Sequence, residues 1–277
     1  MRSMPYTTVA GERIFYTLHR GDPEGQRNLV CVHGAGGNHL HWPPELRRLA
    51  GVNVYALDLP GHGRSEGRGR SSIAAYRDFL IALLDALGLE RVVLAGHSMG
   101  GAIALDLALH RPTRLAGLIL VGSGARLRVA PAILEGILAD FEAAVDLICD
   151  WAYGPHAPEQ FKRLGREQMA RTPPQVLHGD FAACDAFDVM ERLGEIRCPT
   201  LVICGTADRL TPPKYSIYFR DHIAGAELVL VKGAGHMVML ERPEAVCEAI
   251  GDFIAQLFPP TAPSGSPAPS APPAPGG

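Results

Sequence analysis

The chain has 277 residues, of which 47% are hydrophobic, and its formal net charge is −3. A chain of this size and composition can bury the core of one globular domain. Its basic and acidic residues are interspersed, which argues against a nucleic-acid or anionic-membrane surface. No apolar run approaches the roughly 18 residues of a membrane span, and the N-terminal stretch lacks the apolar run of a signal peptide. We therefore expect a cytoplasmic protein that acts on a small molecule, without nucleic-acid partners or membrane insertion; the sequence carries no signal for an oligomeric state.

Apolar and alternating runs in the first half predict strands, and three- and four-residue spacing between them predicts helices. Strand patterns occur at YTTVA, RIFYTLH, NLVCVHG, VNVYALDLPGHG, RVVLAG and LAGLILVGSG. An amphipathic helix is predicted over residues 73–87, before Gly88, and a second helix begins near Met99. Because strands alternate with helices and several strands are apolar throughout, we predict an α/β fold with a mostly parallel central sheet flanked by helices.

The second half predicts an insertion followed by the rest of the sheet. Residues 126–193 show helical apolar spacing and no strand pattern, so we predict a helical cap between a first core part, residues 1–125, and a second core part, residues 194–258. In the second part CPTLVICG and AELVLVKGAG predict strands, and Pro243 begins a final helix. Residues 259–277 contain only Pro, Ala, Ser, Gly and Thr, a composition that predicts a disordered tail.

Cysteine and histidine spacing gives no sign of a structural metal. The six cysteines lie mostly in apolar segments without a CxxC pair, so we interpret them as small core residues rather than disulfides. His33, His39 and His41 share a short loop, but the sequence around them has no zinc-type spacing of cysteine or carboxylate partners. We therefore predict no metal site there.

Ser98 lies between two glycines in LAGHSMGGAIALDLA, residues 94–108, where a predicted strand gives way to a helix. The G-x-S-x-G nucleophile motif requires this context. A sharp strand-to-helix turn holds the serine in a strained backbone conformation, and Gly96 and Gly100 are expected to avoid clashes with adjoining backbone. The hydroxyl would then project at the carboxyl edge of the sheet, where α/β proteins bind ligands. Alone, the pentapeptide also fits an ordinary glycine-rich helix start.

A nucleophilic serine needs a base and a group that orients the base. Asp208 follows the predicted strand TLVICG, and His236 follows the predicted strand ELVLV. Both are therefore expected at the same sheet edge as Ser98, in the chain order Ser, Asp, His. Taken singly, Asp208 also fits a turn former and His236 a packed core histidine.

An acyl-transfer site also needs donors for a negatively charged oxygen. The glycine-rich segment VCVHGAGGN ends another predicted strand, and it matches neither a P-loop nor a dinucleotide fingerprint. We assign the oxyanion hole to the backbone N–H groups of Ala35 and of Met99, the residue after the nucleophile.

The motifs HGAGGN, DLPGHGRS, GHSMGG, CGTADRLTPP and GAGHMVMLERPE together resemble those of α/β-hydrolase fold enzymes of the esterase and lipase type, in that family's order. The resemblance covers residues 5–258. It implies that Ser98 is the nucleophile, that His236 is the general base and then the acid, and that Asp208 orients His236. It also implies that the helical insertion is a cap.

A further match concerns loop structure rather than chemistry. Asp58, His62 and Arg64 lie in DLPGHGRS, a stretch that the family uses chiefly to shape a loop. We leave these three residues out of the catalytic set.

The type of nucleophile narrows the reaction that the resemblance implies. Haloalkane dehalogenases and epoxide hydrolases of this fold carry aspartate at the position of Ser98, and dienelactone hydrolases carry cysteine. We therefore expect hydrolysis of carboxylic esters of small to medium, mostly apolar substrates through an acyl-serine, with no metal or organic cofactor. A lactonase, a carbon–carbon bond hydrolase and a cofactor-free perhydrolase share the triad and remain alternatives, although such peroxidases often carry Trp where this chain has Ala35. The non-enzymatic alternative is a hydrolase-like protein that binds a small ligand.

The predicted cap supplies apolar residues that could line a substrate pocket. They are Ile133, Leu134, Ile137, Leu138, Phe141, Val145, Ile148, Trp151 and Phe161. At helical spacing most of them are expected to form the core of the cap itself, and only a few to face the cleft. We interpret Asp180 and Asp185 as solvated helix ends.

Overall fold

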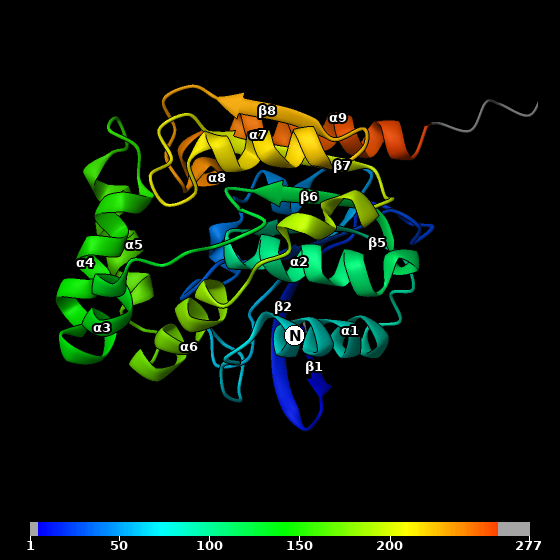
Figure 1. Ribbon diagram of the computed structural model, residues 1–277. Helices are drawn as coiled ribbons and strands as arrows, with labels where there is room; N and C mark the ends of the chain where they lie inside the picture. The colour runs from blue at the N-terminus through cyan, green and yellow to red at the C-terminus, as the bar shows by residue number, and fades with distance from the viewer. Residues whose placement is uncertain (1–4, 260–277) are drawn as a thin grey trace, which may run out of the picture.

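The computed structural model describes residues 5–259, and its centre is a sheet of eight strands in the order β1-β2-β4-β3-β5-β6-β7-β8 (Figure 1). The strands are β1 (Tyr6–Val9), β2 (Glu12–His19), β3 (Asn28–Val32), β4 (Asn53–Leu57), β5 (Val92–His97), β6 (Leu115–Val121), β7 (Thr200–Gly205) and β8 (Glu227–Val231). Strand β2 pairs antiparallel with β1 and with β4, and every other pair is parallel. The predicted fold, a mostly parallel sheet, is confirmed.

Helices cover both faces of this sheet and one of its ends (Figure 1). The α-helices of the described residues are α1 (Ile73–Ala86), α2 (Met99–His110), α3 (Pro131–Ala139), α4 (Phe141–Ala152), α5 (Glu159–Met169), α6 (Pro174–Asp185), α7 (Pro213–His222), α8 (Val238–Glu241) and α9 (Pro243–Leu257). Short 3-10 helices span His39–His41, Leu46–Arg48, Pro112–Arg114 and Met190–Glu195. Ser72 caps α1 by accepting a hydrogen bond from the Ala75 N–H, in agreement with the predicted helix start.

Each face of the sheet has its own hydrophobic core, because successive side chains of a strand point to opposite faces. Leu29 and Cys31 of β3 pack in the cluster that contains the apolar face of α9, whereas Val30 and Val32 pack in the cluster that contains α1 and α2. Strands covered on both sides in this way are buried along their whole length, as β3 and β5 are.

Helices α3 to α6 lie between β6 and β7 in sequence, beside the end of the sheet to which the arrowheads of β6 and β8 point (Figure 1). Apolar residues of α3, α4 and α6 form a small core of their own. The two ends of this helical segment lie together, because Arg126 and Asp188 form an antiparallel bridge and an ion pair at 2.6 Å. The predicted cap, residues 126–193, falls on this segment, and its standing as a separate domain remains a prediction.

Three further expectations concern the chain as a whole. The six cysteines are free thiols, four of them buried and two half-buried, which confirms their interpretation as packed residues. Within residues 5–259 no helix has both the length and the apolar character needed to cross a membrane. The predicted tail, residues 259–277, lies outside the described residues except for Pro259.

Candidate active site

Ser98 lies at the turn from β5 into α2 with φ 53° and ψ −116°. This backbone conformation is unfavourable for a residue that has a Cβ atom. The flanking glycines make the turn possible: a Cβ on Gly96 would lie 2.1 Å from the carbonyl oxygen of Gly100, and a Cβ on Gly100 would lie 2.3 Å from that of Val32. The expected strained turn and the expected need for both glycines are therefore confirmed.

The backbone of Ser98 is held on both sides while its side chain opens onto a cavity. Its N–H donates to the carbonyl oxygen of Val121 at 3.0 Å, and its carbonyl oxygen accepts from the hydroxyl of Ser123 at 2.8 Å. The cavity has a volume of about 200 Å³ and is lined by Ser98 and His236 together. Among residues 5–259 the Ser98 hydroxyl has no hydrogen-bond partner, so it is not hydrogen-bonded to His236, although both residues line the cavity.

Asp208 and His236 are brought together at the carboxyl ends of β7 and β8. His236 Nδ1 lies 2.9 Å from Oδ2 of Asp208, and both side chains are buried. The other oxygen, Oδ1, accepts the backbone N–H groups of Leu210 at 2.9 Å and Thr211 at 2.8 Å. The Thr211 hydroxyl donates to Oδ2 at 2.8 Å and also lies 3.1 Å from Nδ1 of His236. The loop after β7 therefore holds the Asp208 carboxylate in place independently of its contact with the His236 imidazole.

These contacts set the ionisation of Asp208 and the tautomer of His236. Burial alone would raise the pKa of Asp208, but the charge and hydrogen bond of His236 and the donors of Thr211 outweigh it and lower that pKa below its ordinary value. An ionised Asp208 can only accept, so Nδ1 of His236 carries a proton. The lone pair of the neutral ring is then on Nε2, on the side of the ring away from Asp208.

His97 contacts both the backbone and the ring of His236. Its Nε2 lies 3.1 Å from the carbonyl oxygen of His236, and the two ring centroids are 4.6 Å apart. Burial, followed by the proximity of His236 and His41, holds the pKa of His97 well below its usual range. A neutral His97 can donate one hydrogen bond without placing a second charge beside His236.

Ala35 and Met99, the residues expected to supply the oxyanion-hole amides, both lie near Ser98. Ala35 lines the same cavity as Ser98. Met99 is the first residue of α2, and the first N–H groups of a helix have no acceptor within it. A Cβ on Gly34 would lie 3.0 Å from Cβ of Ser98, which shows how closely the loop after β3 approaches the serine.

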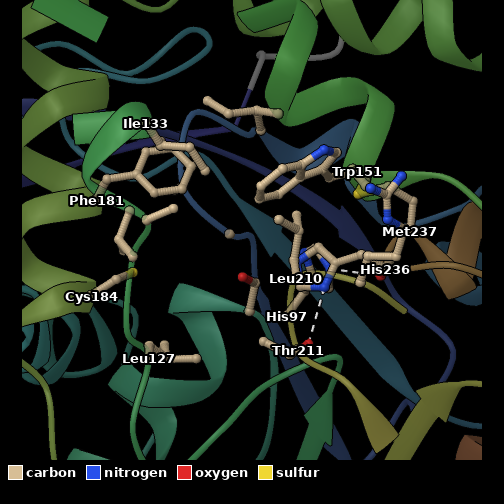
Figure 2. Close-up of a pocket in the computed structure, with 18 of the residues that line it drawn as sticks. His97, Leu127, Ile133, Trp151, Phe181, Cys184, Leu210, Thr211, His236 and Met237 are labelled. Carbon is tan, nitrogen blue, oxygen red and sulfur yellow. Dashed lines mark hydrogen bonds between the residues drawn. The ribbon is translucent and has the colours of Figure 1, made fainter. Parts of the chain in front are cut away.

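The remaining cavity wall is mostly apolar and comes largely from the helical segment. Of the nine apolar residues proposed for the pocket, Ile133, Ile148 and Trp151 line it. Figure 2 shows Ile133, Phe181 and Cys184 across the cavity from His236 and Met237. The others do not line it: Ile137 and Val145 are buried in the core of the helical segment, for example, as expected for most of the nine.

The interpretation of Asp180 as a solvated helix end is wrong. Its side chain is fully buried and accepts hydrogen bonds from Tyr76 and the Gly36 N–H, and its Oδ2 lies 2.7 Å from His62 Nε2. Asp185, at the end of the same helix, is only partly buried and accepts the Val129 N–H at 3.0 Å. Neither carboxylate lines the cavity.

The segment with Asp58, His62 and Arg64 shapes a loop, as the resemblance implied. Asp58 is fully buried and accepts the N–H groups of His39 at 2.7 Å and Arg64 at 2.8 Å. None of these five residues, Asp58, His62, Arg64, His39 and Asp180, lines the cavity.

Sequence reasoning missed Thr211 and His97 as partners of His236. The signal for Thr211 was present: an Asp followed by a hydroxyl residue three positions later can close a hydrogen-bonded turn. His97 had no such signal, because its partner is a backbone carbonyl 139 positions away.

Comparisons with known proteins agree with this fold. The family model described as the alpha/beta hydrolase family matches residues 29–249. A thermophilic esterase of known structure is 36% identical with a TM-score of 0.82, covering 92% of this chain and 98% of that chain.

Two curated relatives have different named activities. The pimeloyl-(acyl-carrier protein) methyl ester esterase of Neisseria meningitidis is 29% identical over 251 residues, which are 84% of this chain and 95% of that protein. The 2-hydroxy-6-oxo-6-phenylhexa-2,4-dienoate hydrolase of Comamonas testosteroni is 29% identical over 267 residues, 87% of this chain and 92% of that protein. With the family model matching most of its length, this chain belongs to the alpha/beta hydrolase family.

Proposed function

We propose that the protein is a serine hydrolase that cleaves carboxylic esters through an acyl-enzyme on Ser98. One observation carries this proposal: a strained serine at a helix start and a histidine bonded to a buried carboxylate line one small cavity. A structural serine has no need for positive φ, and a structural histidine has no need to line the same cavity as that serine. The arrangement supports the roles of nucleophile and base for Ser98 and His236.

In the first half of the proposed reaction, Oγ of Ser98 attacks the ester carbonyl carbon while His236 Nε2 takes the hydroxyl proton. The carbonyl oxygen becomes an oxyanion, which the N–H groups of Ala35 and Met99 stabilise. Asp208 stays ionised and stabilises the imidazolium, because its pKa is already lowered in the folded protein. The protonated His236 then gives its proton to the departing alcohol, which leaves acyl-Ser98.

The second half repeats the same steps with water. His236 removes a proton from a water molecule, the hydroxide attacks the acyl carbon, and Ser98 departs after it takes the proton back. The products are a carboxylic acid and an alcohol. Every proton transfer uses His236, and the chain's own residues supply all the groups that the reaction requires.

The cavity supports small to medium, mostly apolar substrates. Its volume of about 200 Å³ and its lining by Ile133, Ile148, Trp151 and Phe181 fit a short acyl or alkyl group rather than a long chain. The named activities of the thermophilic esterase and of the Neisseria methyl ester esterase agree with ester hydrolysis.

A second candidate is hydrolysis of a carbon–carbon bond next to a ketone, which the named activity of the Comamonas relative favours. The same residues would serve, because both reactions need a nucleophile or activated water at a carbonyl carbon. Lactone cleavage and peracid formation also use an acyl-serine.

The test is hydrolysis of a series of p-nitrophenyl esters, from acetate to laurate. A panel of lactones and a panel of vinylogous diketones are assayed in parallel to test the alternative reactions. We expect turnover that is highest for the short esters and that Ser98→Ala abolishes. Ser72→Ala, the matched change at the cap of α1 and outside the cavity lining, should retain the parent rate. Equal turnover by Ser98→Ala would refute the proposal, and ligand binding without any turnover by the parent would favour a binding protein instead.

A further inference from the structure

Asp180 joins the helical segment to three separate places in the part of the chain that contains the sheet. It lies in α6, fully buried, and Oδ1 accepts the hydroxyl of Tyr76 at 2.6 Å. Oδ2 has two partners: the N–H of Gly36 at 2.9 Å and Nε2 of His62 at 2.7 Å. These partners are 104 to 144 positions away in sequence. None of them is one of the proposed catalytic residues Ser98, Asp208 and His236.

The contacts of His62 identify the charges of His62 and Asp180. His62 has an acceptor at each ring nitrogen, since Nδ1 lies 3.0 Å from the carbonyl oxygen of Pro60 and Nε2 faces Asp180. Both nitrogens therefore carry protons, and His62 is an imidazolium paired with a carboxylate. Burial opposes the charge of His62, but the Asp180 carboxylate outweighs it and raises the pKa of His62 above its ordinary value. Burial and Asp180 also raise the pKa of Tyr76, which keeps its proton and donates it.

Gly36 is held from two sides by the helical segment. Its N–H donates to Asp180, and its carbonyl oxygen accepts the hydroxyl of Thr172 at 3.1 Å. Gly36 has φ 62°, and a Cβ there would lie 2.5 Å from a methyl carbon of Leu177 in α6. The loop after β3 is thus packed and hydrogen-bonded against the helices that cover the cavity. Ala35, the residue just before Gly36, lines the cavity itself.

On the other side of Ala35 the peptide plane is fixed from the sheet domain. The carbonyl oxygen of Gly34 accepts the N–H of Gly37 at 3.1 Å and lies 2.8 Å from Nδ1 of His33. His33 can donate there, because its Nε2 accepts the N–H of Leu59 at 3.0 Å. In a trans peptide the carbonyl and the following N–H point in opposite directions. With the Gly34 oxygen held by these donors, the N–H of Ala35 is directed away from them.

We propose that Asp180 and Thr172 are positioning residues that hold the Ala35 amide in the orientation that an oxyanion requires. The helical segment then does more than cover the cavity, because the oxyanion hole is complete only while α6 is docked on the loop after β3. This inference rests on the proposed function for its consequence in catalysis. The clamp itself rests on the contacts of Gly36.

Asp180→Asn is the sharpest perturbation, because Oδ2 serves two donors at once. If the amide nitrogen takes the place of Oδ2, it faces the N–H of Gly36. If the amide oxygen takes that place, the bond to Gly36 remains, but His62 loses the carboxylate that stabilises its charge. We expect kcat/KM for a p-nitrophenyl ester to fall about 10- to 100-fold, less than or comparable with the ~10²- to 10³-fold loss when an oxyanion donor is removed outright.

Inhibitor binding separates a loosened oxyanion hole from a general loss of structure. A trifluoromethyl alkyl ketone adds Ser98 to its carbonyl and forms an oxyanion, whereas the matched carboxamide stays planar. For Asp180→Asn the inhibition constant of the ketone should rise by the same factor as kcat/KM falls, while that of the carboxamide changes less than about twofold. Asp221→Asn, the same change on the exposed end of α7 and outside the cavity lining, should alter neither constant.

Thr172→Val removes the second contact with Gly36 and is close to the parent in shape. It should weaken ketone binding in the same direction as Asp180→Asn, and it decides the question alone if Asp180→Asn does not fold. Folded variants that bind the ketone and turn over ester within about twofold of the parent would overturn the proposal.

Amide hydrogen exchange tests the clamp without any activity. The Gly36 N–H should be protected in the parent and should exchange faster in Asp180→Asn, whereas the Leu59 N–H, bonded to His33, should not change. A parent that hydrolyses no ester but shows this pattern would refute the proposed function and retain the clamp. Asparagine can still accept the Gly36 N–H through its amide oxygen, so the deciding variant is Asp180→Ala, which has no side-chain acceptor. Unchanged exchange at Gly36 in folded Asp180→Ala would refute the clamp itself.

Discussion

Replacing Ser98, the proposed nucleophile, by glycine should give a more stable protein than replacing it by alanine. Ser98 has φ 53° and ψ −116°, a region that glycine reaches without a Cβ clash. A residue with a side chain in such a conformation carries strain of about 1–3 kcal/mol. Ser98→Ala is the proper reference, because alanine also lacks the hydroxyl but keeps the Cβ atom and its strain.

The magnitude follows from two opposing effects. Glycine relieves the strain, but it gains more entropy than alanine in the unfolded state, which costs about 0.5–1 kcal/mol. The net expectation is that Ser98→Gly exceeds Ser98→Ala by about 1 kcal/mol in free energy of unfolding. For a domain of this size that difference corresponds to about 2–4 °C in Tm.

The assay is equilibrium urea unfolding of both variants, with a thermal scan as a second measurement. The control is the same pair of substitutions at Ser216, which lies inside α7. There the order should reverse, because glycine in a helix interior is about 1 kcal/mol less favourable than alanine. If alanine is the more stable residue at position 98 as well, the strain assigned to this turn is refuted.

Two further changes test the packing and the charge of the site. Gly96→Ala should leave little folded protein, because its Cβ would lie 2.1 Å from the Gly100 oxygen, whereas Gly194→Ala, with no atom within 4 Å of its Cβ, should fold like the parent; equal yields and Tm values for the two would contradict this. The folded-state pKa of Asp208 is lowered, so its charge stabilises the folded protein above the ordinary value of about 3.9, and this contribution is lost as pH falls through the lowered value. The deficit in free energy of unfolding of Asp208→Asn should therefore be constant above about pH 5 and shrink below about pH 4; a deficit that grows on acidification would show the opposite sign for the pKa shift.

Much of the fold and the turn at Ser98 could be predicted because their causes are local. Buried parallel strands must be apolar on both faces, and strand-to-helix turns of this tightness admit only glycine at positions 96 and 100. The positions of Asp208 and His236 followed from topology, since residues just after parallel strands share one edge of the sheet. The sequence signals for these features lie within a few residues of the positions that they determine.

The burial of Asp180 could not be predicted in this way. Its helix, α6, has a polar residue on most turns, and a carboxylate on a helix is usually solvated. What buries it is the pair of partners His62 and Tyr76, which reach it from a loop and from α1 across more than 100 positions. The same holds for His97, whose partner is a backbone oxygen with no identity in the sequence. Long-range polar contacts depend on the packed structure, and no local sequence pattern predicts them.

The most direct measurement of the central claim is the mass of the enzyme during turnover. The protein is mixed with a p-nitrophenyl ester, quenched in acid within the initial burst, and examined by intact mass and peptide mapping. We expect one acyl group per chain, on the peptide that contains Ser98, and none in Ser98→Ala. An acyl group on another residue, or steady turnover by Ser98→Ala with no acyl-enzyme in either protein, would contradict the account.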